Sequence, residues 1–135
     1  MDIALLVIVG AVLSFCIHEL SHLLAIKISM TDATWSGITS FRINRTHESL
    51  VTLRWIARAG FVGQLVLGTC LALLLPHTWF AIGYAGWSAG EVVTYPLRRR
   101  TSGDFKMLDA YEGHGQREFW LYAAWAAVNL ITITW

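Results

Sequence analysis

The feature that most constrains this chain is an apolar stretch, residues 3–26, that contains the pentapeptide His18-Glu19-Leu20-Ser21-His22. A helix places residues i and i+4 on one face, so both imidazoles can reach one metal ion with Glu19 beside it as a base. Ionisable groups are costly to bury in hydrocarbon, and inside a membrane span they indicate a functional site. With the His and Glu content of this 135-residue chain, the HExxH spacing arises by chance in roughly one shuffled sequence in 150.

The composition is that of a membrane protein. Hydrophobic residues make up 56% of the chain and charged residues 14%, which is more apolar and less charged than an ordinary globular domain. The length fits a single domain, residues 1–135. Cys16 and Cys70 both lie in apolar segments, so we expect no structural disulfide. We therefore expect one mostly α-helical, polytopic domain in the lipid bilayer, without a nucleic-acid partner.

Four segments are long enough, or nearly so, to cross a bilayer core that needs about 20 apolar residues. They are residues 3–26, 56–75, 78–95 and 119–135. Pro76-His77-Thr78 predicts a tight turn between the second and third spans. Of the 10 Lys and Arg residues, nine fall between spans one and two or between spans three and four, and the tenth, Arg58, lies at the start of the second span on the same side. With four spans these basic connections share one side, which the positive-inside rule assigns to the cytoplasm. The sequence thus predicts a multi-pass protein of the cell membrane with both termini outside.

The connection between the first two spans differs from its surroundings. Residues 38–43 and 50–55 are β-prone runs separated by the polar residues 44–49. We expect a β-hairpin over Ile38–Trp55 at the cytoplasmic face, with an open edge that an extended peptide could join. An irregular amphipathic loop on the lipid headgroups is the alternative.

Small residues at four-residue spacing occur in two of the expected spans. Ala59 precedes Gly63 by four residues, and Gly86 and Gly90 form a GxxxG pattern. Such pairs let helices approach closely in lipid. Glycine is also common in membrane helices without such a role.

Two histidines do not complete a hydrolytic zinc site, which uses three protein ligands and one open position. If the cytoplasmic end of the first span is Ile26, His22 lies about 6 Å and His18 about 12 Å inside that end. The third ligand must therefore come from the cytoplasmic side. Asp104, after the third span, and Glu91, near the end of that span, are the two candidates. If Glu91 is not a ligand, it can orient a metal-bound histidine through the second ring nitrogen.

The order of these features resembles the site-2 protease family of intramembrane zinc metalloproteases. The chain has an HExxH in its first span, a β-rich cytoplasmic connection, and a following span that begins Ala59-Gly60. That family takes its third ligand from an Asn-x-x-Pro…Asp-Gly segment, and Pro96 and Asp104 stand at the proline and the aspartate. Its members often carry an accessory domain, for which this chain has no room.

The resemblance implies a reaction and a site. Zn²⁺ held by His18, His22 and Asp104 would activate a water molecule, and Glu19 would accept its proton and deliver it to the leaving amine. The substrate would be a peptide bond in or next to a transmembrane segment, in a membrane-anchored protein or a remnant signal peptide. The residues that bind substrate and the oligomeric state are not predicted.

A non-enzymatic function is the alternative from a different class. Val93 replaces the asparagine of the family segment, and the Asp-Gly order is inverted to Gly103-Asp104. These departures are compatible with a catalytically silent four-helix scaffold subunit of a larger complex. An ion path through Glu91 and the histidines is a further possibility, but the short spans show no broken-helix signal.

Overall fold

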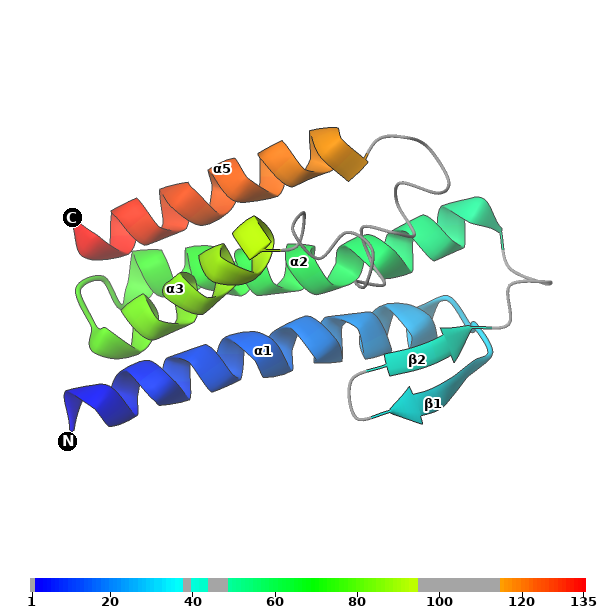
Figure 1. The fold of residues 1–135 in the computed structure, drawn as a ribbon, viewed down its shortest axis with the longest axis horizontal. Coiled ribbons are helices and arrows are strands. Elements are labelled where there is room, and N and C mark those ends of the chain that lie inside the picture. The colour runs from blue at the N-terminus through cyan, green and yellow to red at the C-terminus, as the bar shows by residue number, and fades with distance from the viewer. Residues whose placement is uncertain (1, 38–39, 44–48, 95–114) are drawn as a thin grey trace.

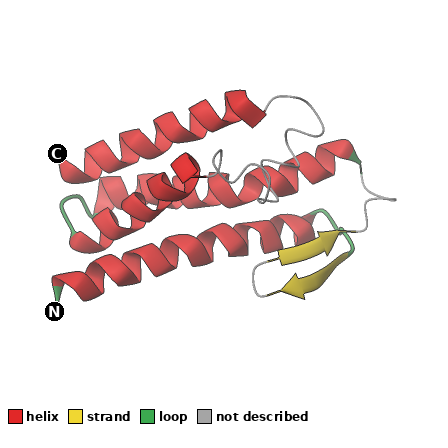
Figure 2. Ribbon diagram, viewed as in Figure 1, coloured by secondary structure: helices red, strands yellow, loops and turns green. Residues whose placement is uncertain are grey.

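The computed structural model describes residues 2–37, 40–43, 49–94 and 115–135. Within these residues the chain forms four helices and one antiparallel pair of strands (Figures 1 and 2). In chain order the elements are α1 (Ile3–Ile28), β1 (Ala33–Gly37), β2 (Ser40–Ile43), α2 (Leu50–Leu74), α3 (Trp79–Thr94) and α5 (Gly115–Thr134). The mostly helical class expected from the sequence is therefore confirmed. Asp104 and Pro96 lie outside the described residues.

The helices form an elongated bundle. α1 and α5 lie on opposite sides of it, with α2 and α3 between them, and both chain termini lie at the same end (Figure 1). α1 packs against α2 and α3, and α5 packs against the same two helices. The candidate metal-binding helix α1 is therefore flanked by α2 and α3 and not by α5.

The burial pattern of α1 is inverted relative to a soluble helix. Its buried face carries a row at four-residue spacing, Gly10, Ser14, His18 and His22. Its outward face is aliphatic, and Ile8, for example, is 58% exposed. Polar groups inside and large apolar groups outside are the pattern expected of a helix that faces lipid.

Two helices among the described residues, α1 and α2, are long and apolar enough to cross a membrane. α3 has 16 residues and α5 has 20, and neither meets the same standard of length and composition. The structure thus supports membrane association through two helices, and the four-span arrangement stays a prediction.

Glycines set the separation between α1 and its neighbours. A Cβ on Gly10 would overlap the Phe80 carbonyl oxygen of α3, and a Cβ on Gly83 would overlap the backbone of Val7. A Cβ on Gly63 would overlap the Ser21 hydroxyl, so this part of the Ala59/Gly63 pair does face α1. By contrast, no other described atom comes within 4 Å of a Cβ built on Gly86 or Gly90. The GxxxG pattern of α3 therefore makes no close helix contact in the described part of the chain.

The expected hairpin is wrong in its second half. β1 and β2 pair antiparallel over Ala33–Ile43, earlier than expected, whereas residues 50–55 form the first turns of α2. The Ser49 hydroxyl accepts a hydrogen bond from the backbone N–H of Thr52 at 3.1 Å and so caps this helix. Leu53, in the same turns, is 2% exposed. Capping and burial against the bundle outweigh the local β-propensity.

The turn at Pro76-His77-Thr78 is confirmed. His77 has a left-handed backbone with φ of 60°, and its N–H donates to the Ile133 carbonyl at 2.9 Å, which ties the turn to α5. The Thr78 hydroxyl accepts from the Ala81 N–H at 3.3 Å and caps α3. The turn thus reverses the chain from α2 into α3 without a glycine.

Candidate metal centre

The two histidines of the HExxH motif meet inside the bundle. His18 and His22 are 3% and 6% exposed, and their Nε2 atoms lie 3.1 Å apart. The rings are nearly perpendicular, with centroids 4.8 Å apart. The structure therefore brings together the two residues that the spacing predicted to act as a pair.

The Nδ1 atoms of both rings face hydrogen-bond acceptors. His22 Nδ1 lies 2.7 Å from the backbone carbonyl oxygen of Ile56, which can only accept. His18 Nδ1 lies 3.4 Å from Gln64 Oε1 and 4.0 Å from Glu91 Oε2. We therefore assign the proton of each neutral ring to Nδ1, which leaves a lone pair on each Nε2. Two lone pairs that face each other at 3.1 Å repel, and a proton or a metal ion between them removes the repulsion.

Gly60 of α2 leaves the space in front of these two nitrogens open. A Cβ built on Gly60 would overlap Nε2 of His22 and lie 2.6 Å from Nε2 of His18. Two nitrogens that bind one tetrahedral zinc ion, each at about 2.0–2.1 Å, are separated by about 3.3 Å. The observed separation of 3.1 Å is close to that value. The donor type, the tautomers and the open space all fit a zinc ion.

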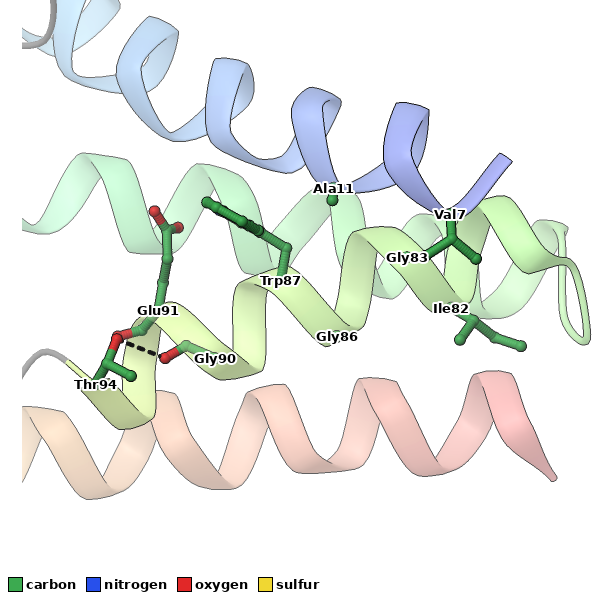
Figure 3. Close-up of a pocket in the computed structure, with 9 residues that line it drawn as sticks. All are labelled: Val7, Ala11, Ile82, Gly83, Gly86, Trp87, Gly90, Glu91 and Thr94. Carbon is green, nitrogen blue, oxygen red and sulfur yellow. Dashed lines mark hydrogen bonds between the residues drawn. The ribbon is translucent and has the colours of Figure 1, made fainter. Parts of the chain in front are cut away.

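A buried amide connects the pair to Glu91. Gln64 is fully buried, and its Nε2 donates to Ser14 Oγ at 2.8 Å and to Glu91 Oε2 at 2.7 Å. Figure 3 shows the Glu91 side chain reaching from α3 toward α1, at one end of a cleft of about 620 Å³ between the two helices. Glu91 is thus linked to the histidine pair through Gln64, on the Nδ1 side of His18.

Aromatic and ionic contacts hold the far side of the pair. The ring of Phe61 meets His18 edge-on, with centroids 4.8 Å apart, and stacks on Tyr122 of α5. Three residues before Phe61, Arg58 Nε donates to both carboxylate oxygens of Glu118, at 2.9 and 3.0 Å. Tyr122 also donates to Glu118, at 3.1 Å. Through Tyr122, helix α5 thus supports the Phe61 side chain that packs against His18.

The remaining predicted residues are placed less completely. Glu19 is half-buried on α1, adjacent to His18 in sequence. Asp104 belongs to the part of the chain outside the described residues, so its role as third ligand stays a prediction. Among the described residues no group of three or more His, Cys, Asp or Glu side chains is arranged to hold a metal ion. The described part of the chain thus supplies two ligands of the expected three.

Three contributors to the site were not assigned a role from the sequence: Gly60, Gln64 and Ser14. Ser14 carries a detectable signal, since it stands four residues before His18 and so shares its helix face. Gln64 is an uncharged polar residue in an apolar span, which is a weaker signal of the same kind. The Ala59-Gly60 start of the span contributes to the family resemblance, but the sequence does not show that Gly60 lies in front of the histidine nitrogens, because this depends on which face of α2 meets α1.

Comparison of the chain with protein-family models, with curated proteins and with solved structures gave no significant match.

Proposed function

We propose that this chain is an intramembrane zinc metalloprotease of the site-2 protease type. It would hydrolyse a peptide bond in or next to a transmembrane segment of a membrane-anchored protein or remnant signal peptide. The observation that carries the proposal is the pair of Nε2 lone pairs converging on the space left by Gly60. The lipid-facing aliphatic surface of α1 supports a position of that pair inside the membrane region.

His18 and His22 would hold Zn²⁺ together with Asp104, whose sequence position matches the third ligand of the family. Zn²⁺ in such a site supplies Lewis acidity, which activates water and polarises a carbonyl. Glu19 accepts a proton from the attacking water and then delivers it to the amine nitrogen as the C–N bond breaks.

The membrane arrangement belongs to the same proposal. Four spans with both termini outside would place the basic connections and the metal centre toward the cytoplasm. Ala33 and Ile43, which belong to the β1–β2 pair, pack against a cluster that includes Ala25 and Ile56, near the His22 end of α1. A transmembrane substrate hides its peptide bonds in its own helix, so it must unwind before attack. An unwound segment added to the edge of this sheet would lie close to the metal centre.

The experiment is zinc analysis of the purified protein, combined with cleavage of a fluorogenic single-span peptide that carries Gly and Pro in its cytoplasmic half. We expect one zinc per chain, loss of zinc in Asp104→Ala, and retained zinc with no cleavage in Glu19→Gln. Unchanged cleavage by Glu19→Gln would remove Glu19 from the chemistry. Absence of zinc from wild-type protein purified without chelators would favour the silent scaffold.

A further inference from the structure

Gln64 is held in one orientation by its surroundings. Its two N–H groups are used by Ser14 Oγ and Glu91 Oε2, and the Ser14 carbonyl oxygen also lies on the same side, at 3.4 Å. Rotating the amide by 180° would point its oxygen at the Glu91 carboxylate and toward the Ser14 carbonyl oxygen, and neither of these can donate a hydrogen bond. Gln64 Oε1 must therefore face His18 Nδ1.

The backbone around Gln64 is fixed as well. The hydroxyl of Tyr84, a fully buried residue of α3, donates to the Gln64 carbonyl oxygen at 2.9 Å. Ser14 is also fully buried, on the helix that carries the histidines. Three helices thus converge on one residue, whose side chain meets His18 at Nδ1 and not at Nε2.

We propose that Gln64 is a positioning residue that keeps the His18 proton on Nδ1 and so keeps the Nε2 lone pair directed at the metal position. The inference rests on the proposed function and extends it to a residue outside the HExxH motif. An acceptor at Nδ1 fixes the tautomer and the orientation of a metal-binding imidazole and raises its basicity. Here that acceptor is an amide oxygen.

The same geometry gives Glu91 a role through Gln64. Glu91 Oε2 is 2.7 Å from Gln64 Nε2 and 4.0 Å from His18 Nδ1. The two nitrogens of an imidazole point in diverging directions, so a carboxylate beside Nδ1 lies away from a metal held by Nε2. Glu91 orients the amide, and the place of the third ligand is left to Asp104.

The test compares variants that keep or remove the acceptor at position 64. Gln64→Leu has a similar volume and no polar atoms. The double variant Gln64→Glu/Glu91→Gln exchanges amide and carboxylate, so the carboxylate at position 64 accepts from His18 Nδ1 and the amide at position 91 donates to that carboxylate. The control is Asn129→Leu, which removes a buried amide of α5 that donates to the Leu65 carbonyl oxygen of α2.

The first readout is the ¹⁵N NMR spectrum of the histidine rings in metal-free protein, which reports the tautomer without any activity. We expect the Nδ1–H form for His18 in wild type, in Asn129→Leu and in the exchanged double variant, and the Nε2–H form to become populated in Gln64→Leu. The second readout is zinc affinity, which should fall by about 10–100-fold in Gln64→Leu and recover in the double variant.

The outcomes separate this inference from the proposed function. If Gln64→Leu keeps both the tautomer and the zinc affinity of wild type, Gln64 is not a positioning residue, whatever the protein does. If Gln64→Leu does not fold, the test uses the double variant Gln64→Glu/Glu91→Gln. The Nε2–H form of His18 in that variant overturns the inference, and the Nδ1–H form supports it. A wild-type protein with the expected tautomer but no zinc binding would refute the proposed function alone.

Discussion

Replacement of Gly60 by alanine is the sharpest perturbation that the structure offers. The new Cβ would lie 2.6 Å from His18 Nε2 and overlap His22 Nε2, whereas ordinary contacts begin at 3.4 Å. The His18 ring must therefore retreat by about 0.8 Å, and the methyl group occupies the space on which both nitrogens converge. Overpacking of this kind costs about 1–3 kcal/mol of stability. Loss of an outer partner of a metal ligand costs about 10–100-fold in affinity, so blocking the metal position should cost more than about 100-fold.

Isothermal titration of metal-free protein with zinc measures this effect, and circular dichroism reports whether the helices persist. Gly86→Ala is a matched control, because its Cβ meets no other described atom within 4 Å. Gly63→Ala is a second control, since its Cβ meets the Ser21 side chain of α1, including Ser21 Cβ at 2.7 Å, and so presses α1 and α2 apart without occupying the space in front of the histidine nitrogens. Wild-type zinc affinity in folded Gly60→Ala would refute the assignment of the metal position. Equal losses in Gly60→Ala and Gly63→Ala would mean that helix separation, and not occupied space, is responsible.

Three further predictions concern the bundle, with stability followed by unfolding in sodium dodecyl sulfate. Gly83→Ala should lower the stability by about 1–3 kcal/mol, because its Cβ would overlap the Val7 backbone. Gly90→Ala, whose Cβ would enter open space, should lower it far less, and equal losses would contradict the close α1–α3 packing. A double-mutant cycle of Arg58→Gln and Glu118→Gln should give a coupling energy of only about 1 kcal/mol, because solvent screens an Arg58 side chain that is 36% exposed. Zero coupling would mean that the ion pair does not contribute to stability. Ser88→Ala should stabilise the protein by about 1 kcal/mol, because the buried Ser88 hydroxyl has no hydrogen-bond partner in the described structure; a clear loss would reveal a partner.

The helical framework could be predicted because it depends on local signals. A window of apolar residues bounded by polar ones defines each helix, and the expected start at residue 3 and the Pro76-His77-Thr78 turn agree with the structure. The predicted start of α2, Ile56, lies six residues after the observed start, Leu50. Residues 50–55 have strand propensity, but in the structure they form helical turns that pack against the bundle. Propensity describes an isolated segment, whereas the buried Leu53 reports packing that only the assembled bundle creates.

The histidine pair could be predicted and its partners could not, for a related reason. His18 and His22 share a face by helix geometry alone. The acceptors at Ile56, Gln64 and Glu91 come from α2 and α3, and which face of each helix turns inward depends on contacts such as Gly63 against Ser21. Such contacts link residues more than 25 positions apart, beyond the reach of any local pattern.

The protease and scaffold hypotheses make different demands on the two imidazoles. In a protein that binds no metal, the pair is most stable when one ring carries its proton on Nε2 and donates to the other ring. That arrangement requires one Nδ1 without a proton, facing a donor. Here both Nδ1 atoms face acceptors, a backbone carbonyl for His22 and an amide oxygen beside a carboxylate for His18. The surroundings of the pair are therefore those expected where a cation occupies the space between the Nε2 atoms. This favours a pair that binds a metal ion over a pair that binds none, and the Glu19→Gln cleavage experiment then separates the metalloprotease from a silent scaffold.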